Sequence, residues 1–164
     1  VVVYAAGLLA MLACSAAYNV FDTGGRRELL RRLDHAAIFA MIAGTYTPFT
    51  QLKLRDNWGL PLIALIWTVA LAGVIIELAT GLKYKKLSLG LYLGMGWLVI
   101  IAIEPMLNHV ATGGLLLLLA GGLSYSFGTI FYAWKSLYLH HMIWHLFVLA
   151  GAMSHFFCIY LTVI

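Results

Sequence analysis

The chain has 164 residues, of which 63% are hydrophobic and only 10% are charged, and its formal net charge at pH 7 is +4. A water-soluble domain of this length needs far more polar surface, so the composition excludes that class and predicts an integral membrane protein. The ten Lys and Arg residues are scattered between apolar runs. That scatter is typical of a membrane-topology signal and argues against a nucleic-acid-binding patch.

Six apolar runs follow one another along the chain, and each is near the roughly 20 residues that a helix needs to cross the hydrocarbon core. They cover residues 1–20, 35–52, 59–79, 87–107, 112–134 and 141–164. Every span must be helical, because lipid offers no hydrogen-bond partner to an open backbone. The connections are short, so we expect neighbouring helices to run antiparallel. The sequence therefore predicts an all-α, polytopic membrane helix bundle, with six helices in a single integral-membrane domain over residues 1–164.

The basic residues in the connections predict the orientation of the bundle. The connections after the first, third and fifth runs hold eight of them: Arg26, Arg27, Arg31, Arg32, Lys83, Lys85, Lys86 and Lys135. The opposite connections hold only Lys53 and Arg55. By the positive-inside rule the first set is cytoplasmic, which places the C-terminus outside. Because Val1 already lies within an apolar run, we also expect a segment to precede it.

Residues 26–33 combine four arginines with three leucines. One interpretation is a short amphipathic helix at the interface that contacts anionic lipid. The other is a loop that only sets the topology.

The most informative polar residues are His141 and His145 in the last run. Imidazoles four residues apart lie on one helix face, about one turn from each other, so both can bind one metal ion. Ionisable side chains are costly within a membrane and usually face a protein interior or a cavity. The predicted topology brings polar side chains of three runs to one membrane depth: Ser15, Asn19, Asp34, His35, His141 and His145.

This set of residue types suits zinc. Imidazole and carboxylate are good zinc ligands, and a catalytic site keeps one position open for water, whose pKa the metal lowers to about 7. Asp34 is a candidate metal ligand, orienting group or general base. The alternative is that the histidines are only hydrogen-bonded interfacial residues.

His155 and Glu77 are ionisable residues of apolar runs that lie outside this set. His155 is ten residues beyond His145, about 15 Å along a helix. We expect it to hydrogen-bond to a neighbouring helix or to line a polar path. Glu77 is near the cytoplasmic end of the third run, and we expect it to reach towards Lys83 or its neighbours at the membrane surface.

Several motifs resemble the hemolysin III family, the bacterial branch of the progestin and adiponectin receptor superfamily. They occupy residues 15–19, 33–38, 43–49, 121–128, 131–132 and 141–149. The resemblance implies a seven-helix protein of the bacterial inner membrane with its N-terminus inside, so that the six runs are the last six helices and the first is missing. It also implies an intramembrane zinc ion near the cytoplasmic face.

The resemblance assigns roles to individual residues. The family's zinc ligands are the His that closes a Ser-x-x-x-His motif and both His of a His-x-x-x-His motif, and the latter two match His141 and His145. The family's Ser and Asp match Ser15 and Asp34. The first ligand position is Asn19 here, and an amide oxygen is a poorer zinc ligand than imidazole.

Three functions remain open at this stage. The first is a zinc-dependent hydrolase of a lipid amide or ester, in which Asp34 accepts a proton and Ser15 orients water or stabilises the oxyanion. The second, suggested by the family name, is a pore-forming or membrane-perturbing cytolysin. The third is a non-enzymatic sensor of membrane lipid state with a structural metal. Each has membrane lipid as its partner, and none involves nucleic acid.

Overall fold

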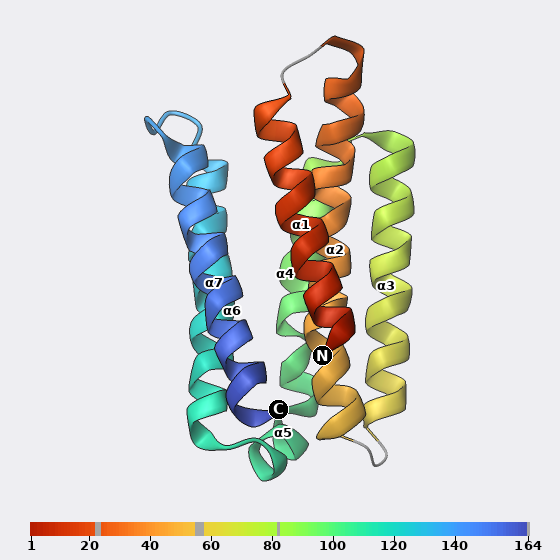
Figure 1. Ribbon diagram of the computed structural model, residues 1–164, viewed down its shortest axis with the longest axis vertical. Helices are drawn as coiled ribbons and strands as arrows, with labels where there is room; N and C mark the ends of the chain where they lie inside the picture. The colour runs from red at the N-terminus through yellow and green to blue at the C-terminus, as the bar shows by residue number, and fades with distance from the viewer. Residues whose placement is uncertain (22–23, 55–57, 82, 164) are drawn as a thin grey trace. The chain divides into compact units, whose positions relative to one another are not determined.

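The structure is a computed structural model that describes residues 1–21, 24–54, 58–81 and 83–163 (Figure 1). Every regular element in these ranges is helical, which confirms the predicted all-α class. The α-helices are α1 (Val2–Val20), α2 (Arg27–Leu52), α3 (Gly59–Thr80), α4 (Lys85–Trp97), α5 (Ile103–His109), α6 (Thr112–Ala133) and α7 (His140–Thr162). Two short 3-10 helices are η1 (Gly24–Arg26) and η2 (Leu98–Ala102), and η2 joins α4 to α5.

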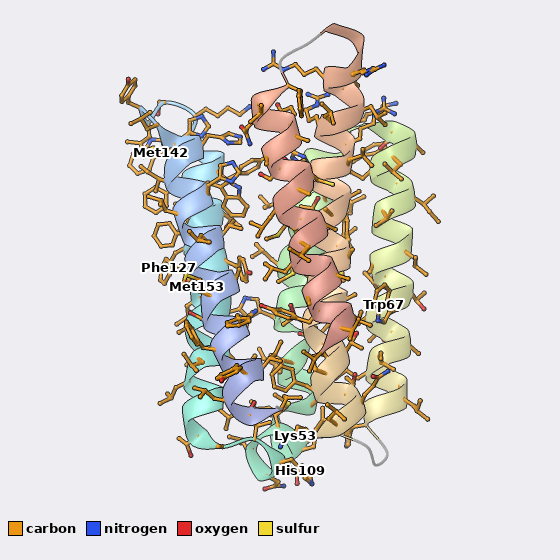
Figure 2. All side chains as sticks on the ribbon, in the orientation of Figure 1. Lys53, Trp67, His109, Phe127, Met142 and Met153 are labelled. Carbon is orange, nitrogen blue, oxygen red and sulfur yellow. The ribbon has the colours of Figure 1, made fainter. Side chains whose placement is uncertain are left out.

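Five helical stretches in the described part of the chain are long and apolar enough to cross a membrane. They are Val2–Val20, Gly59–Thr80, Lys86–His109, Thr112–Ala133 and His140–Thr162. Apolar side chains on these helices are exposed, as a lipid environment requires. Phe127 and Met142 are each 52% exposed and Met153 is 51% exposed, and all three are marked in Figure 2.

Helix α2 corresponds to the second predicted run, but it is not among those five stretches. Its 26 residues include two charged turns at the start and a set of buried threonines near the end. The hydroxyls of Thr45 and Thr47 donate to the carbonyls of Met41 and Ala43, at 2.9 and 2.8 Å. These polar atoms are therefore satisfied within the helix, and the neighbouring helices rather than lipid enclose them.

The chain divides into two compact units, Val1–Leu98 and Val99–Ile164, which we describe separately. In the first unit α2 packs against α1 and α3 and, to a smaller extent, against α4. A Cβ atom added at Gly7 of α1 would lie 3.4 Å from the Ala40 carbonyl oxygen, and one at Gly44 of α2 would lie 3.2 Å from that of Val3. These glycines let the two backbones approach closely.

Side chains of α2 tie the first unit together. The Phe39 ring lies against Gly73 of α3 and 4.5 Å from the Tyr92 ring of α4, centroid to centroid. The Tyr46 hydroxyl hydrogen-bonds to the carbonyl oxygens of Met95, at 2.8 Å, and Gly96, at 3.0 Å. The indole of Trp67, labelled in Figure 2, donates to the Thr47 hydroxyl at 3.2 Å. Helix α2, whose buried residues include three threonines, thus contacts α3 and α4 through individual side chains.

The prediction that Glu77 reaches towards Lys83 or its neighbours at the membrane surface is wrong. The Glu77 side chain is only 1% exposed, and its Oε2 accepts a hydrogen bond of 2.8 Å from the Ser88 hydroxyl of α4. Its Oε1 is buried and has no hydrogen-bond partner among the described residues. Ser88 offers a buried donor on the adjacent helix, and α4 covers the carboxyl group.

In the second unit α6 and α7 form an antiparallel pair in which aromatic rings rest on glycines. A Cβ atom at Gly121 would overlap the His155 ring, and one at Gly151 would lie 2.8 Å from the Tyr125 ring. His155 Nε2 donates to the carbonyl oxygen of Leu118 on α6 at 3.4 Å. This contact confirms the expectation that His155 hydrogen-bonds to a neighbouring helix.

Candidate metal centre

The first turn of α7 brings the predicted histidine pair together. The Nδ1 atom of His141 lies 3.3 Å from the Nε2 atom of His145, and the ring centroids are 5.2 Å apart. Two nitrogen ligands at zinc–nitrogen distances of 2.0–2.1 Å in tetrahedral geometry are about 3.3–3.4 Å apart. The pair therefore has the spacing of two ligands on one zinc ion. A direct hydrogen bond between the rings is the alternative at this distance.

Two rings lie beside His141, whose side chain is exposed, within the second unit. The Tyr132 ring of α6 lies 6.0 Å from the His141 ring and 5.4 Å from the Trp144 ring. The His140 ring lies 5.7 Å from that of His141. These contacts restrict the orientation of His141.

His140 was not predicted as part of the candidate site. Its Nδ1 atom is buried and has no hydrogen-bond partner among the described residues. Its sequence position, directly before His141, puts it on a different helix face from the pair, so the spacing rule that found the pair did not select it. Its buried nitrogen and its ring contact with His141 distinguish it.

In the first unit the structure brings Ser15 and Asn19 together at the end of α1. The Nδ2 atom of Asn19 donates to the main-chain carbonyl of Ser15 at 2.8 Å. The Asn19 side chain is exposed and that of Ser15 is half-buried. The bond engages the amide nitrogen and leaves the amide oxygen as the atom that can bind a metal.

Asp34 and His35 begin the buried part of α2. Their side chains are 14% and 15% exposed, and His35 Nδ1 lies 3.8 Å from Asp34 Oδ2. His35 Nδ1 donates to the carbonyl of Arg31 at 2.9 Å, which fixes the tautomer and leaves Nε2 unprotonated in the neutral ring. The carboxyl group of Asp34 lies within electrostatic range of the Cys14 thiol, in the residue before Ser15. Thus α1 and α2 hold the predicted carboxylate near the polar end of α1.

The predicted residues are divided between the units, with Ser15, Asn19 and Asp34 in the first and His141 and His145 in the second. Over the described ranges, no group of three or more His, Cys, Asp or Glu side chains is arranged to hold a metal ion. Within the second unit, two imidazoles have the spacing of two ligands on one metal ion. Zinc binding therefore stays a prediction.

The apolar helices and their buried polar groups define a polytopic helical membrane protein. A family model described as "Haemolysin-III related" matches residues 1–156. The chain belongs to the haemolysin III family, which confirms the resemblance seen in the sequence motifs, and it is an integral membrane protein.

Curated relatives extend this comparison. The chain is 47% identical to "Hemolysin-3" of Bacillus cereus, over 80% of this chain and 60% of that protein. It is 44% identical to "Hemolysin-3 homolog" of Bacillus subtilis (strain 168), over 81% of this chain and 62% of that protein. It is 30% identical to "Monocyte to macrophage differentiation factor" of Homo sapiens, over 96% of this chain and 68% of that protein. No solved structure matches. The chain thus spans about three-fifths of the length of the Bacillus relatives.

Proposed function

We propose that this chain is part of a zinc-dependent membrane hydrolase that cleaves an amide or ester bond of a lipid. The observation that carries the proposal is the 3.3 Å separation of His141 Nδ1 and His145 Nε2, which suits two ligands of a tetrahedral ion. When bound, zinc supplies two things: it polarises the substrate carbonyl and lowers the pKa of water to about 7.

The protein's own residues supply the remaining steps. Asp34, whose side chain is mostly shielded from solvent, accepts a proton from the attacking water and delivers it to the leaving amine or alcohol. Ser15 orients the water or donates to the oxyanion that forms on the acyl carbonyl. Asn19 offers its amide oxygen as a third metal ligand. The common membrane depth that the sequence predicts for these residues supports their assignment to one site.

Metal analysis of the purified protein tests the binding step. We expect stoichiometric zinc in the wild type, none in the His141→Ala/His145→Ala variant, and tighter zinc binding in Asn19→His. His109→Ala is the matched control, because His109 lies at the end of α5 and its Nδ1 donates to the Pro105 carbonyl. Zinc in Asn19→His but not in the wild type would show that this chain has lost the metal.

Hydrolysis of ceramides and phospholipids by the zinc-loaded protein tests the chemistry. We expect turnover in the wild type and at least a 100-fold loss in Asp34→Asn with zinc retained, because general-base catalysis contributes about 10²–10⁴. Absence of turnover, in an assay where a related ceramidase works, contradicts the hydrolase. Loss of thermal stability on chelation without turnover would point to a lipid sensor with a structural metal.

A membrane-perturbing cytolysin is the second candidate, and the observation that favours it is the name "Hemolysin-3" of the Bacillus relatives. Dye release from liposomes distinguishes the two functions. Release by His141→Ala equal to that by the wild type favours the cytolysin, because that activity needs no metal.

A further inference from the structure

The start of α2 and the end of α3, which are far apart in the sequence, contact each other at one end of the first unit. Arg32 Nη1 donates to the carbonyl oxygen of Leu78, near the end of α3, at 2.7 Å. Gly81, which ends α3 with φ 53°, lies against the side chains of Arg32 and Glu28. The start of α2 and the end of α3 accordingly lie at the same end of this unit (Figure 1).

These contacts show what the 26–33 segment is. Arg27 to Leu33 form the first turns of α2 rather than a separate interfacial helix. A signal that sets topology needs only the number of basic residues in a connection. The contacts of Arg32 with Leu78 and Gly81 go beyond that, because they place the start of α2 beside the end of α3, two residues before Lys83.

The charges at this end are only partly compensated. We define the basic cluster as Arg26, Arg27, Arg31, Arg32, Lys83 and Lys86. Glu28 pairs with Arg31 and with Arg32, in the latter case at 3.1 Å. Arg26, Lys83 and Lys86 are exposed and have no carboxylate partner among the described residues. The cluster thus presents at least three cations that are available to an external anion.

Apolar side chains are interleaved with these cations. Leu29 is 54% exposed, Tyr84 is 48% exposed and Leu87 is 50% exposed. Lys83 Nζ lies 5.6 Å from the centroid of the Tyr84 ring. A soluble anion gains nothing from exposed leucines, whereas a phospholipid places its phosphate beside cations and its acyl chains beside apolar groups. Tyrosine is also typical of the membrane–water interface.

We propose that the basic cluster binds the headgroup of a phospholipid that carries more than one phosphate. Arg26, directly before α2, and Lys83 and Lys86, after the end of α3, approach such a headgroup from two segments, and each segment neutralises one phosphate. Arginine binds phosphate through two parallel hydrogen bonds, and lysine binds it as a point charge. The bond between Arg32 and Leu78 holds the two segments at a fixed separation. This proposal does not depend on the metal.

Reconstitution of the full chain in phosphatidylcholine nanodiscs tests the proposal. The discs contain either cardiolipin, with two phosphates, or phosphatidylglycerol at equal total charge, and native mass spectrometry counts the lipids retained. We expect the wild type to retain cardiolipin preferentially. The variant Arg26→Gln/Lys83→Gln/Lys86→Gln should bind it about 100-fold more weakly, because each basic side chain near an anionic surface contributes about fivefold in affinity. Lys53→Gln/Lys135→Gln, which alters basic residues elsewhere, should bind cardiolipin like the wild type.

Three results would overturn the proposal. The first is cardiolipin retention by the triple variant at the wild-type level. The second is equal retention of phosphatidylglycerol, which would remove the need for two phosphates. The third is stabilisation by soluble inorganic pyrophosphate equal to that by cardiolipin, which would identify a soluble anion site. Thermal unfolding in pure phosphatidylcholine discs checks the fold of the triple variant, and we expect no change there, because its three side chains are exposed.

Discussion

The α1–α2 pair and the α6–α7 pair both pack through glycines, but the glycines contact different groups. Gly7 and Gly44 each contact the main chain of the opposite helix. Gly121 and Gly151 each contact an aromatic ring, of His155 and Tyr125 respectively. A main-chain contact only requires small residues at the crossing point, whereas a ring on a glycine requires a matched pair of side chains. The packing of α6 against α7 therefore depends more on the identity of individual side chains than the packing of α1 against α2. We expect the α6–α7 pair to be the more sensitive to substitution.

The largest expected effect is that of Gly121→Ala. The added methyl group overlaps the His155 ring, so the ring or the helix must move, at a net cost of about 2 kcal/mol in the free energy of unfolding. Denaturant titration of the purified protein in micelles measures this change. Gly113→Ala is the control, since no heavy atom outside its own helix backbone lies within 4 Å of that position. Equal stability of the two variants would contradict the ring-on-glycine interpretation.

The next effect is that of Tyr46→Phe in the first unit. The hydroxyl bonds to the carbonyls of Met95 and Gly96, just before the helix changes from α4 to η2. Its loss should cost about 0.5–1.5 kcal/mol, because two carbonyls lose a donor. The midpoint of thermal unfolding reports this change. If Tyr46→Phe costs more than Gly121→Ala, polar bonds rather than ring packing are the more sensitive contacts.

Gly44→Ala should have a smaller effect. The added Cβ would lie 3.2 Å from the Val3 carbonyl oxygen, so the helices must separate by a few tenths of an ångström. The gain in helix propensity, about 0.8–1 kcal/mol, offsets most of that cost, and we expect a net loss of roughly 0.5 kcal/mol. Comparison with Gly94→Ala, which meets nothing within 4 Å, isolates the contact. A loss as large as that of Gly121→Ala would remove the distinction between the two pairs.

The smallest effect concerns pH and Glu28. The hydrogen bond from Arg32 chiefly, together with the charges of Arg31 and Arg32, lowers the pKa of this carboxyl below its usual value. A lowered pKa in the folded state means that the stabilisation is present above the unfolded pKa and is lost as the pH falls through the folded one. The difference in melting temperature between wild type and Glu28→Gln should therefore shrink between about pH 6 and about pH 3. A difference that grows on acidification would contradict the assignment.

Most of the fold could be predicted from the apolar runs, because hydrophobic length decides which segments cross a membrane. The start of α2 could not. The run predicted a beginning at residue 35, whereas the helix begins at Arg27. An apolar run predicts only the part of a helix that lies within the hydrocarbon core. The charged turns of α2 continue the helix beyond that part, so its first residue could not be predicted. The fourth run, residues 87–107, lies within the stretch formed by α4, η2 and α5, and nothing in its hydropathy indicates the change to a 3-10 helix.

The candidate site could be predicted only where helical periodicity decides the geometry. The four-residue spacing of His141 and His145 predicts adjacent imidazoles, and the structure has them at 3.3 Å. The burial of Glu77 depends on which residue of another helix covers it, and sequence position says nothing about that. The same holds for the buried nitrogen of His140.

The composition of α2 has a consequence for how the protein is made. A helix that enters the bilayer alone must be apolar enough to prefer lipid to water. Helix α2 is the least suited to this, and its polar atoms are covered by its neighbours. We therefore expect the insertion of α2 to depend on its packing against α1 and α3. The order of synthesis, with α2 between two strongly apolar helices, suits that dependence.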